Sequence, residues 1–213
     1  MLETAVKGLL VGFLVSSPMG PINMLTIQRT LNRGRWHGFV SGLGAMLSDI
    51  TYALITIIGL SFISDFLSEN EKILQIAGSI ILFFFGIGVF KSNPLRKWTS
   101  SYIPEETRYI KDFLSSFLLT FSNIAIVLIL IGLYARFNFN PAEQGLHAVL
   151  AGMAGFTTAA ILWWFSLTTL VSHLRKRIRR NGLIYLNRII GTVFMIIGIG
   201  GIVLSVFPKL YTV

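Results

Sequence analysis

The stretch Ser16-Ser17-Pro18-Met19-Gly20-Pro21-Ile22-Asn23 lies in the middle of an apolar run from residue 5 to residue 31. The run is long enough to cross a lipid bilayer, because a spanning helix needs about 20 residues. Pro18, Gly20 and Pro21 disfavour a continuous helix, since a proline lacks an N–H and clashes with the preceding turn. In lipid, the freed carbonyl groups must be satisfied by protein or by a polar cavity. The sequence therefore predicts a break at membrane depth, which is either a packing kink or a small-molecule site.

The composition is that of an integral membrane protein. Of the 213 residues, 54% are hydrophobic and only 13% are charged, and the mean hydropathy is +0.72. A soluble domain carries about 25% charged residues. The apolar segments are long and lack the alternating pattern of outer-membrane strands, which favours a helical bundle over a barrel. The first segment has no basic n-region and no cleavage site, so we expect a retained helix and not a signal peptide.

Six apolar spans are predicted, and the fold class is therefore all-α, a polytopic membrane bundle of six transmembrane helices. The spans lie at about residues 5–31, 36–63, 73–92, 113–136, 145–172 and 185–207. Cysteine is absent from the chain, which excludes thiol–disulfide electron transfer, thiolate metal sites and cysteine nucleophiles.

The net charge of +9 does not indicate a nucleic-acid partner, because the basic residues lie in short connections between the spans. Fourteen of the 18 Lys and Arg residues lie in the first, third and fifth connections, when Arg29 is counted with the first. Basic residues collect on the cytoplasmic side of a membrane protein. We therefore expect these three connections in the cytoplasm and both termini on the outer face.

The two halves of the chain resemble each other. Residues 36–43 of the second span match residues 146–153 of the fifth, and Ser17-Pro18 falls opposite Ser122-Asn123. Three spans is an odd number, so the second copy must run upside down in the membrane, an arrangement that recurs in secondary transporters. The predicted domains are a first three-helix repeat at 1–92, a cytoplasmic linker at 93–112 and a second, inverted repeat at 113–213.

Asp49 is the only ionisable side chain that the predicted spans place well inside the membrane. A charged Asp at that depth costs roughly 3 kcal/mol on insertion scales. It is either a neutral acid hydrogen-bonded between helices, or a group that carries a proton or binds a cation. The second interpretation is favoured, because no Lys or Arg lies at the same depth to form a static pair.

Other polar and helix-breaking groups share the depth of Asp49, counted at about 1.5 Å of rise per residue. The second half of a broken first helix would begin near Gly20 or Pro21 and present N–H groups, which suit a carboxylate ligand. Asp49 would carry a proton or meet the substrate amine. The predicted site for a zwitterionic amino acid consists, besides Asp49, of Pro18, Gly20, Pro21, Asn23, Ser122 and Asn123. The small residues at Gly38, Gly42, Gly152 and Gly155 are better explained by close helix packing.

Several of these features resemble the LysE/RhtB superfamily of amino-acid exporters. They are Gly20-Pro21-Ile22-Asn23 in the first span, a Gly-rich second helix that ends in Ser48-Asp49, and Thr120-Phe121-Ser122-Asn123 in the fourth. The family usually has Pro-Gly-Pro in the first helix and Asn-Pro in the fourth, whereas this chain has Met19 after Pro18 and Ile124 after Asn123. The resemblance implies a bacterial inner-membrane efflux protein, and the charge bias described above then places both termini in the periplasm. The resemblance also implies export of amino acids or related metabolites, coupling to protons, and an often dimeric assembly.

Two other function classes fit the sequence less well. An intramembrane serine protease needs a serine with a histidine at matching depth, whereas His37, His147 and His173 lie at the ends of the predicted helices. Export of divalent metal cations is the alternative that stays open. It is less favoured, because one buried carboxylate, without a cysteine or a histidine at membrane depth, provides few ligands for a metal ion. We expect no catalytic residues, no metal site and no cofactor, and membrane lipid as the surrounding partner.

Overall fold

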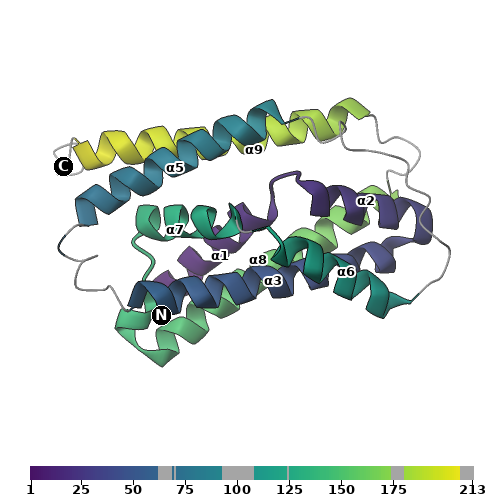
Figure 1. Ribbon diagram of the computed structural model, residues 1–213, viewed down its shortest axis with the longest axis horizontal. Helices are drawn as coiled ribbons and strands as arrows, with labels where there is room; N and C mark the ends of the chain where they lie inside the picture. The colour runs from purple at the N-terminus through teal and green to yellow at the C-terminus, as the bar shows by residue number, and fades with distance from the viewer. Residues whose placement is uncertain (62–68, 70, 93–107, 124, 174–179, 207–213) are drawn as a thin grey trace.

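The computed structural model describes residues 1–61, 69, 71–92, 108–123, 125–173 and 180–206, and the chain is helical throughout this part (Figure 1). The elements are α1 (Leu2–Ser16), α2 (Pro21–Arg33), α3 (Arg35–Ser61), α5 (Glu71–Lys91), α6 (Tyr109–Phe121), α7 (Ala125–Phe137), a short 3-10 helix (Pro141–Gln144), α8 (Leu146–His173) and α9 (Arg180–Val206). The all-α prediction is confirmed for the described residues. Most of the predicted linker lies outside them, and its last four residues form the first turn of α6.

Four helices of the described chain are long and apolar enough to cross a membrane, namely α3, α5, α8 and α9. The other spans are bent pairs: α1 and α2 meet at 76°, and α6 and α7 meet at 69°. A half-helix of 13 to 15 residues is shorter than the bilayer core, which needs about 20 residues. The chain is a multi-pass membrane protein with four spans, or up to six if each bent pair counts as one.

The helices run along the long axis of the molecule in three tiers (Figure 1). The pair α5 and α9 lies along one side, and α7 packs against α5. On the opposite side, α3 packs on α6 and α8, while α1 lies along α8. The first helix begins and the last helix ends at the same end of the long axis, as expected for an even number of crossings.

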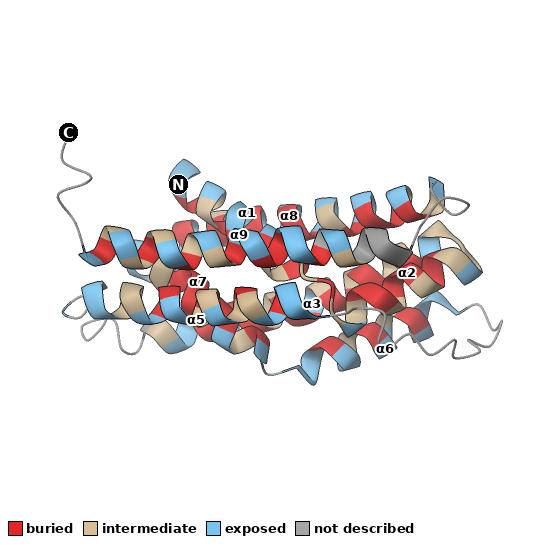
Figure 2. Ribbon diagram, turned by 90° about the horizontal axis from the view of Figure 1, so that it is seen from above, coloured by how far each residue is buried: buried red, intermediate tan, exposed pale blue. Residues whose placement is uncertain are grey.

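The surface of the bundle is apolar where a bilayer would contact it. Figure 2 shows exposed residues along the outward faces of α5 and α9, and buried residues on the faces that meet the other helices. Large apolar side chains are among the exposed ones, including Phe84 at 65% and Ile196 at 64%. Extended exposed apolar surfaces mark contact with a membrane or another protein. These faces are therefore suited to contact with a membrane or with another protein.

The small residues serve close helix packing, as predicted. A Cβ added at Gly42 would overlap the Trp164 ring, and one added at Gly155 would overlap the backbone of Ala5. A Cβ added at Gly38 would likewise overlap the side chain of Thr30. Removal of a side chain lets two helix backbones approach, and the gain in van der Waals contact stabilises helix pairs in lipid.

Candidate functional site

The predicted break of the first span is present, and side chains from elsewhere satisfy its backbone. Gly20 is the extended N-cap of α2, and Pro21 occupies the first turn, where a missing N–H costs nothing. Asn23 Nδ2 donates to the carbonyl oxygens of Ser16 at 3.2 Å and of Pro18 at 2.9 Å. Trp163 Nε1 donates to Asn23 Oδ1 at 3.3 Å. Asn23, predicted to bind substrate, thus uses its amide to close the end of α1.

Asn187 of α9 joins the break to the α5–α9 pair. Its Oδ1 accepts the N–H of Met19 at 3.1 Å. Its Nδ2 donates to the carbonyls of Val89 at 2.9 Å and Ser92 at 3.2 Å, at the end of α5. The side chain is 1% exposed. One buried amide therefore satisfies three backbone groups from two segments that are far apart in sequence.

A pocket of about 420 Å³ opens at the break. The break supplies one wall and the facing ends of α5 and α9 supply the other. It is lined by Pro18, Met19, Gly20, Phe84, Phe85, Gly88, Val89, Ser92 and Asn187. Pro18 and Gly20 of the predicted site thus line a real cavity. Asp49 is not among its lining residues, so the structure does not bring every predicted residue to one wall.

Asp49 is buried in the middle of α3, with 4% exposure. Two neighbours of Asp49 on α3 bond to backbone carbonyls of α6. Ser48 Oγ donates to Phe117 O at 2.7 Å, and Tyr52 Oη donates to Phe121 O at 2.5 Å. These bonds tie α3 to the last turn of α6, directly before the second break. One turn earlier, Ala45 packs in the same cluster as Met19 of the first break. Asp49 therefore lies on the part of α3 that bonds to the end of α6, one turn from the cluster that includes Met19.

Several polar groups of the described helices lack a protein partner, and two of them lie near the ends of α1 and α6. Within the described part of the chain, the Asp49 carboxylate has no hydrogen bond or ion pair. Ser16 Oγ at the end of α1, Thr120 Oγ1 near the end of α6 and Trp164 Nε1 also lack a protein partner. A buried polar group left unpaired costs about 1–3 kcal/mol. These atoms could hold a proton, water or a polar ligand.

The second break occurs without a proline. Ser122 caps α6, the Asn123 N–H donates to Thr120 O at 2.9 Å, and the N–H of Ile126 donates to Asn123 O at 3.1 Å. Residue 124 lies outside the described residues. Both Ser122 and Asn123 are exposed in the bundle. The structure places them at the periphery, and it is Thr120, one turn earlier, that is buried.

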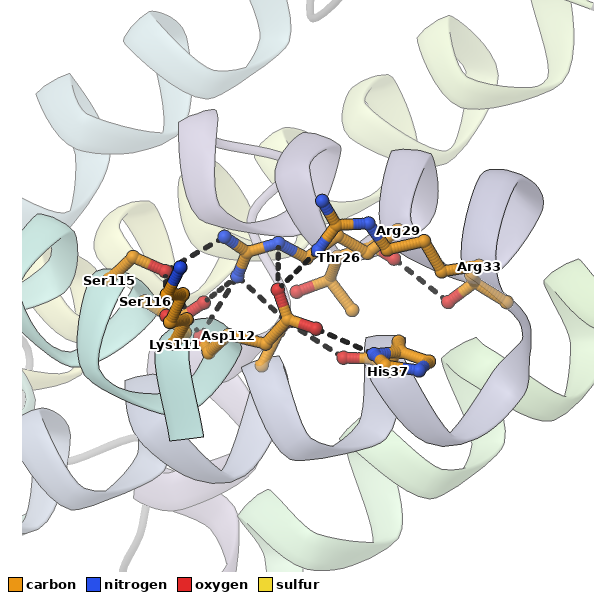
Figure 3. A network of polar contacts seen from close by, with 10 residues as sticks. Thr26, Arg29, Arg33, His37, Lys111, Asp112, Ser115 and Ser116 are labelled. Atoms are coloured by element: carbon orange, nitrogen blue, oxygen red, sulfur yellow. Dashed lines mark hydrogen bonds and ion pairs between the residues drawn. The ribbon is translucent and has the colours of Figure 1, made fainter. Parts of the chain in front are cut away.

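A buried charge network, which the sequence reasoning missed, joins α2, α3 and α6 at one end of the bundle (Figure 3). The Asp112 side chain is 1% exposed and lies between two arginines and a histidine. Arg29 Nε is 3.1 Å and Arg33 Nη1 is 3.0 Å from Asp112 Oδ1. His37 Nδ1 is 2.7 Å from Asp112 Oδ2, and the His37 ring stacks on Tyr109.

Arg29 makes further bonds that satisfy its guanidinium. Nη1 donates to the hydroxyls of Ser41 at 2.9 Å and Ser116 at 2.8 Å, and to Asp112 O at 2.9 Å. Nη2 donates to Ser115 Oγ at 2.8 Å. Buried ion pairs persist when hydrogen bonds satisfy the remaining donors. The sequence reading assigned Arg29 to the loop charge that sets orientation. The available signal was the four-residue spacing of Arg29 and Arg33, which puts both on one helix face.

Comparison with known proteins agrees with this architecture. A family model described as LysE type translocator matches residues 13–204. The chain is 29% identical over 195 residues, 89% of this chain and 90% of the relative, to a Bacillus subtilis (strain 168) protein named "Putative amino acid efflux protein YcgF". No solved structure matches the chain. With a matching family model over most of its length and with this set of apolar helices, the chain belongs to the LysE type translocator family.

Proposed function

We propose that this translocator exports amino acids or related small metabolites across the bacterial inner membrane as a proton-coupled secondary transporter. The name of the Bacillus relative supports amino-acid efflux. The observation that carries the proposal is the buried carboxylate of Asp49, which has no hydrogen bond or ion pair in the described part of the chain and lies on α3 at the level of the end of α6. A carboxyl group in that position takes up a proton or meets an ammonium group, and exchange of the two would couple export to proton entry.

In this proposal each bent pair is one span, which gives six spans in two inverted repeats, with both termini in the periplasm. The packing supports this reading. In the inverted repeat, α1 corresponds to α6, α3 to α8, and α5 to α9. The α1–α8 contact then corresponds to the α6–α3 contact, whereas the α3–α8 and α5–α9 contacts each join a helix to its own counterpart. All four contacts are present. The α5–α7 contact is much larger than its counterpart between α2 and α9, so the proposed symmetry is incomplete.

Alternating access would move one group of helices against another around the central site. The charge network of Arg29, Arg33, His37 and Asp112 ties α2, α3 and α6 into one unit. The α5–α9 pair meets the break through Asn187. We infer that these two groups of helices move relative to each other during transport. The predicted partners of the protein are protons, membrane lipid and a second copy of the chain.

Export from cells tests the function. A bacterial strain that lacks its own exporters is loaded with dipeptides, and release of the free amino acids is measured with and without this protein. Faster release of one or more amino acids is expected. Resistance to divalent metal ions, without any effect on amino-acid release, would overturn the proposal in favour of metal-cation export.

A further inference from the structure

We propose that the pocket at the first break receives the side chain of the transported amino acid, and that Gly88 limits the size of that side chain. The inference rests on the proposed function and names its substrate class: amino acids with uncharged, apolar side chains. Three observations carry it, namely the position of the pocket, the chemistry of its walls and the open space above Gly88.

The position of the pocket is continuous with the break. Pro18 and Gly20 form one wall, and α2 begins directly after them. The other wall comes from the last two turns of α5 and from Asn187 near the start of α9. The first N–H groups of a helix have no intrahelical carbonyl partner. A solute with its α-carboxylate near the start of α2 would therefore extend its side chain into the pocket.

The walls of the pocket are apolar. Phe84, Phe85 and Val89 are among the lining residues, and none of the described lining residues is ionisable. The polar atoms of Asn187 are already bonded to Met19 and to the end of α5. A charged side chain in this pocket would lose its hydration without gaining a counterion, which is costly. An apolar side chain would gain contact, and a pocket of about 420 Å³ is of a size that holds small ligands.

Gly88 differs from the packing glycines of the same helix pair. A Cβ at Gly86 would lie 2.7 Å from Gly191 O, so that glycine is needed for the α5–α9 contact. A Cβ at Gly88 would meet no atom within 4 Å, although Gly88 lines the pocket. The helix contact therefore does not require glycine at this position. A larger residue there would occupy the space that we assign to the substrate side chain.

A lipid acyl chain is the competing occupant, because the rim of the pocket includes the exposed Phe84. The start of α2 argues against it. The first N–H groups of α2 have no intrahelical carbonyl partner and follow directly after the lining residues Pro18 and Gly20, and a hydrocarbon chain gains nothing from them. An amino acid has an α-carboxylate for these N–H groups and an apolar side chain for the apolar lining.

Gly88→Leu and Gly200→Leu form a matched pair for the test. Gly200 on α9 also has no atom within 4 Å of an added Cβ, and it does not line the pocket. The purified full-length chain is reconstituted in proteoliposomes, and counterflow of labelled alanine, leucine, lysine and glutamate is measured. For the unmodified protein we expect transport of alanine and leucine, with lysine and glutamate at least roughly tenfold slower.

Gly88→Leu is expected to lower leucine transport roughly tenfold, the discrimination that one or more methylenes give in an apolar pocket, while alanine stays within about twofold. Gly200→Leu should leave both rates unchanged. If Gly88→Leu does not fold, Gly88→Ala should lower the leucine-to-alanine ratio about fourfold, the value of one buried methylene.

Three results would overturn the inference while leaving export intact. They are preferred transport of lysine or glutamate, an equal loss of alanine and leucine in Gly88→Leu, and unchanged leucine transport in a folded Gly88→Leu. The last result is the one expected if a lipid chain fills the pocket. Transport of none of the four amino acids, in a protein that does release other amino acids in the cellular export test, would also overturn the inference, whereas no release of any amino acid in that test would overturn the proposed function itself.

Discussion

Arg29 Nε and Asp112 Oδ1 lie 3.1 Å apart, and the two side chains are 9% and 1% exposed. The pair joins α2 to α6, across most of the first half of the chain. A single residue, Gly34, separates α2 from α3, and its φ of 103° is one that L side chains rarely adopt. α2 is therefore held at its start by the break, at its end by a tight turn and along its side by the ion pair.

Loss of the Asp112 charge should destabilise the bundle. Asp112→Asn leaves Arg29 and Arg33 buried without a counterion, and breaking a buried pair in this way costs about 3–5 kcal/mol. Denaturant unfolding of the purified protein in detergent measures the change. Glu3→Gln is the control, because Glu3 of the Glu3–Lys7 pair is exposed and ion pairs at exposed positions contribute little to stability. Equal stability of the two variants would contradict a structural role for Asp112.

Removal of the Asn187 amide should increase local opening of the backbone at the break between α1 and α2. Asn187→Ala leaves the Met19 N–H and two α5 carbonyls without their partner, at a cost of about 1–3 kcal/mol for an unpaired buried group. We expect faster hydrogen exchange at the amide of Met19. Thr51→Ala is the control, since the Thr51 hydroxyl bonds only within its own helix at an exposed position. Unchanged exchange at Met19 in Asn187→Ala would show that the bond does not hold the break.

The carboxylate of Asp49 should be required for export. Asp49→Asn keeps the size of the side chain but cannot carry a proton or a negative charge, so we expect release of amino acids to fall by at least roughly tenfold, the usual effect of losing a proton-transfer group. Glu143→Gln, at an exposed position, should export at the unmodified rate. If Asp49→Asn reaches the membrane folded and exports normally, Asp49 has no role in coupling.

The ends of α5 test the predicted orientation. The chain has no cysteine, so single cysteines can be placed at Lys72 and Lys91, which are exposed at opposite ends of the helix. The charge bias predicts that a membrane-impermeant maleimide labels Lys72→Cys from outside intact cells and does not label Lys91→Cys. The reverse labelling pattern would invert the topology.

Close contact between α1 and α8 should be sensitive to added volume. A Cβ at Gly8 would overlap the backbone of Gly152, so Gly8→Val must push the helices apart, and overpacking typically costs about 1–3 kcal/mol. Gly200→Val, in open space, is the matched control. The melting temperature in detergent should fall for Gly8→Val and stay unchanged for Gly200→Val.

The local features of the chain could be predicted because they depend on neighbouring residues. Pro18, Gly20 and Pro21 interrupt a helix wherever it packs, and the break is present where their positions indicated. The packing role of Gly42 and Gly155 was likewise read from spacing. The predicted substrate roles of Asn23 and Asn123 remain predictions. In the structure Asn23 bonds to the end of α1, and Asn123 is exposed.

The sequence by itself determined the all-helical apolar bundle, the break of the first span and the burial of Asp49, because in lipid each backbone group must be satisfied within its own segment or at a marked break. Only the tertiary structure decided which polar side chains meet. Asn187 reaches Met19 across 168 residues, and Arg29 bonds to the carbonyl of Asp112 across 83. Such pairs depend on the rotation and register of helices packed side by side, and a change of one residue in register would turn each group toward a different neighbour.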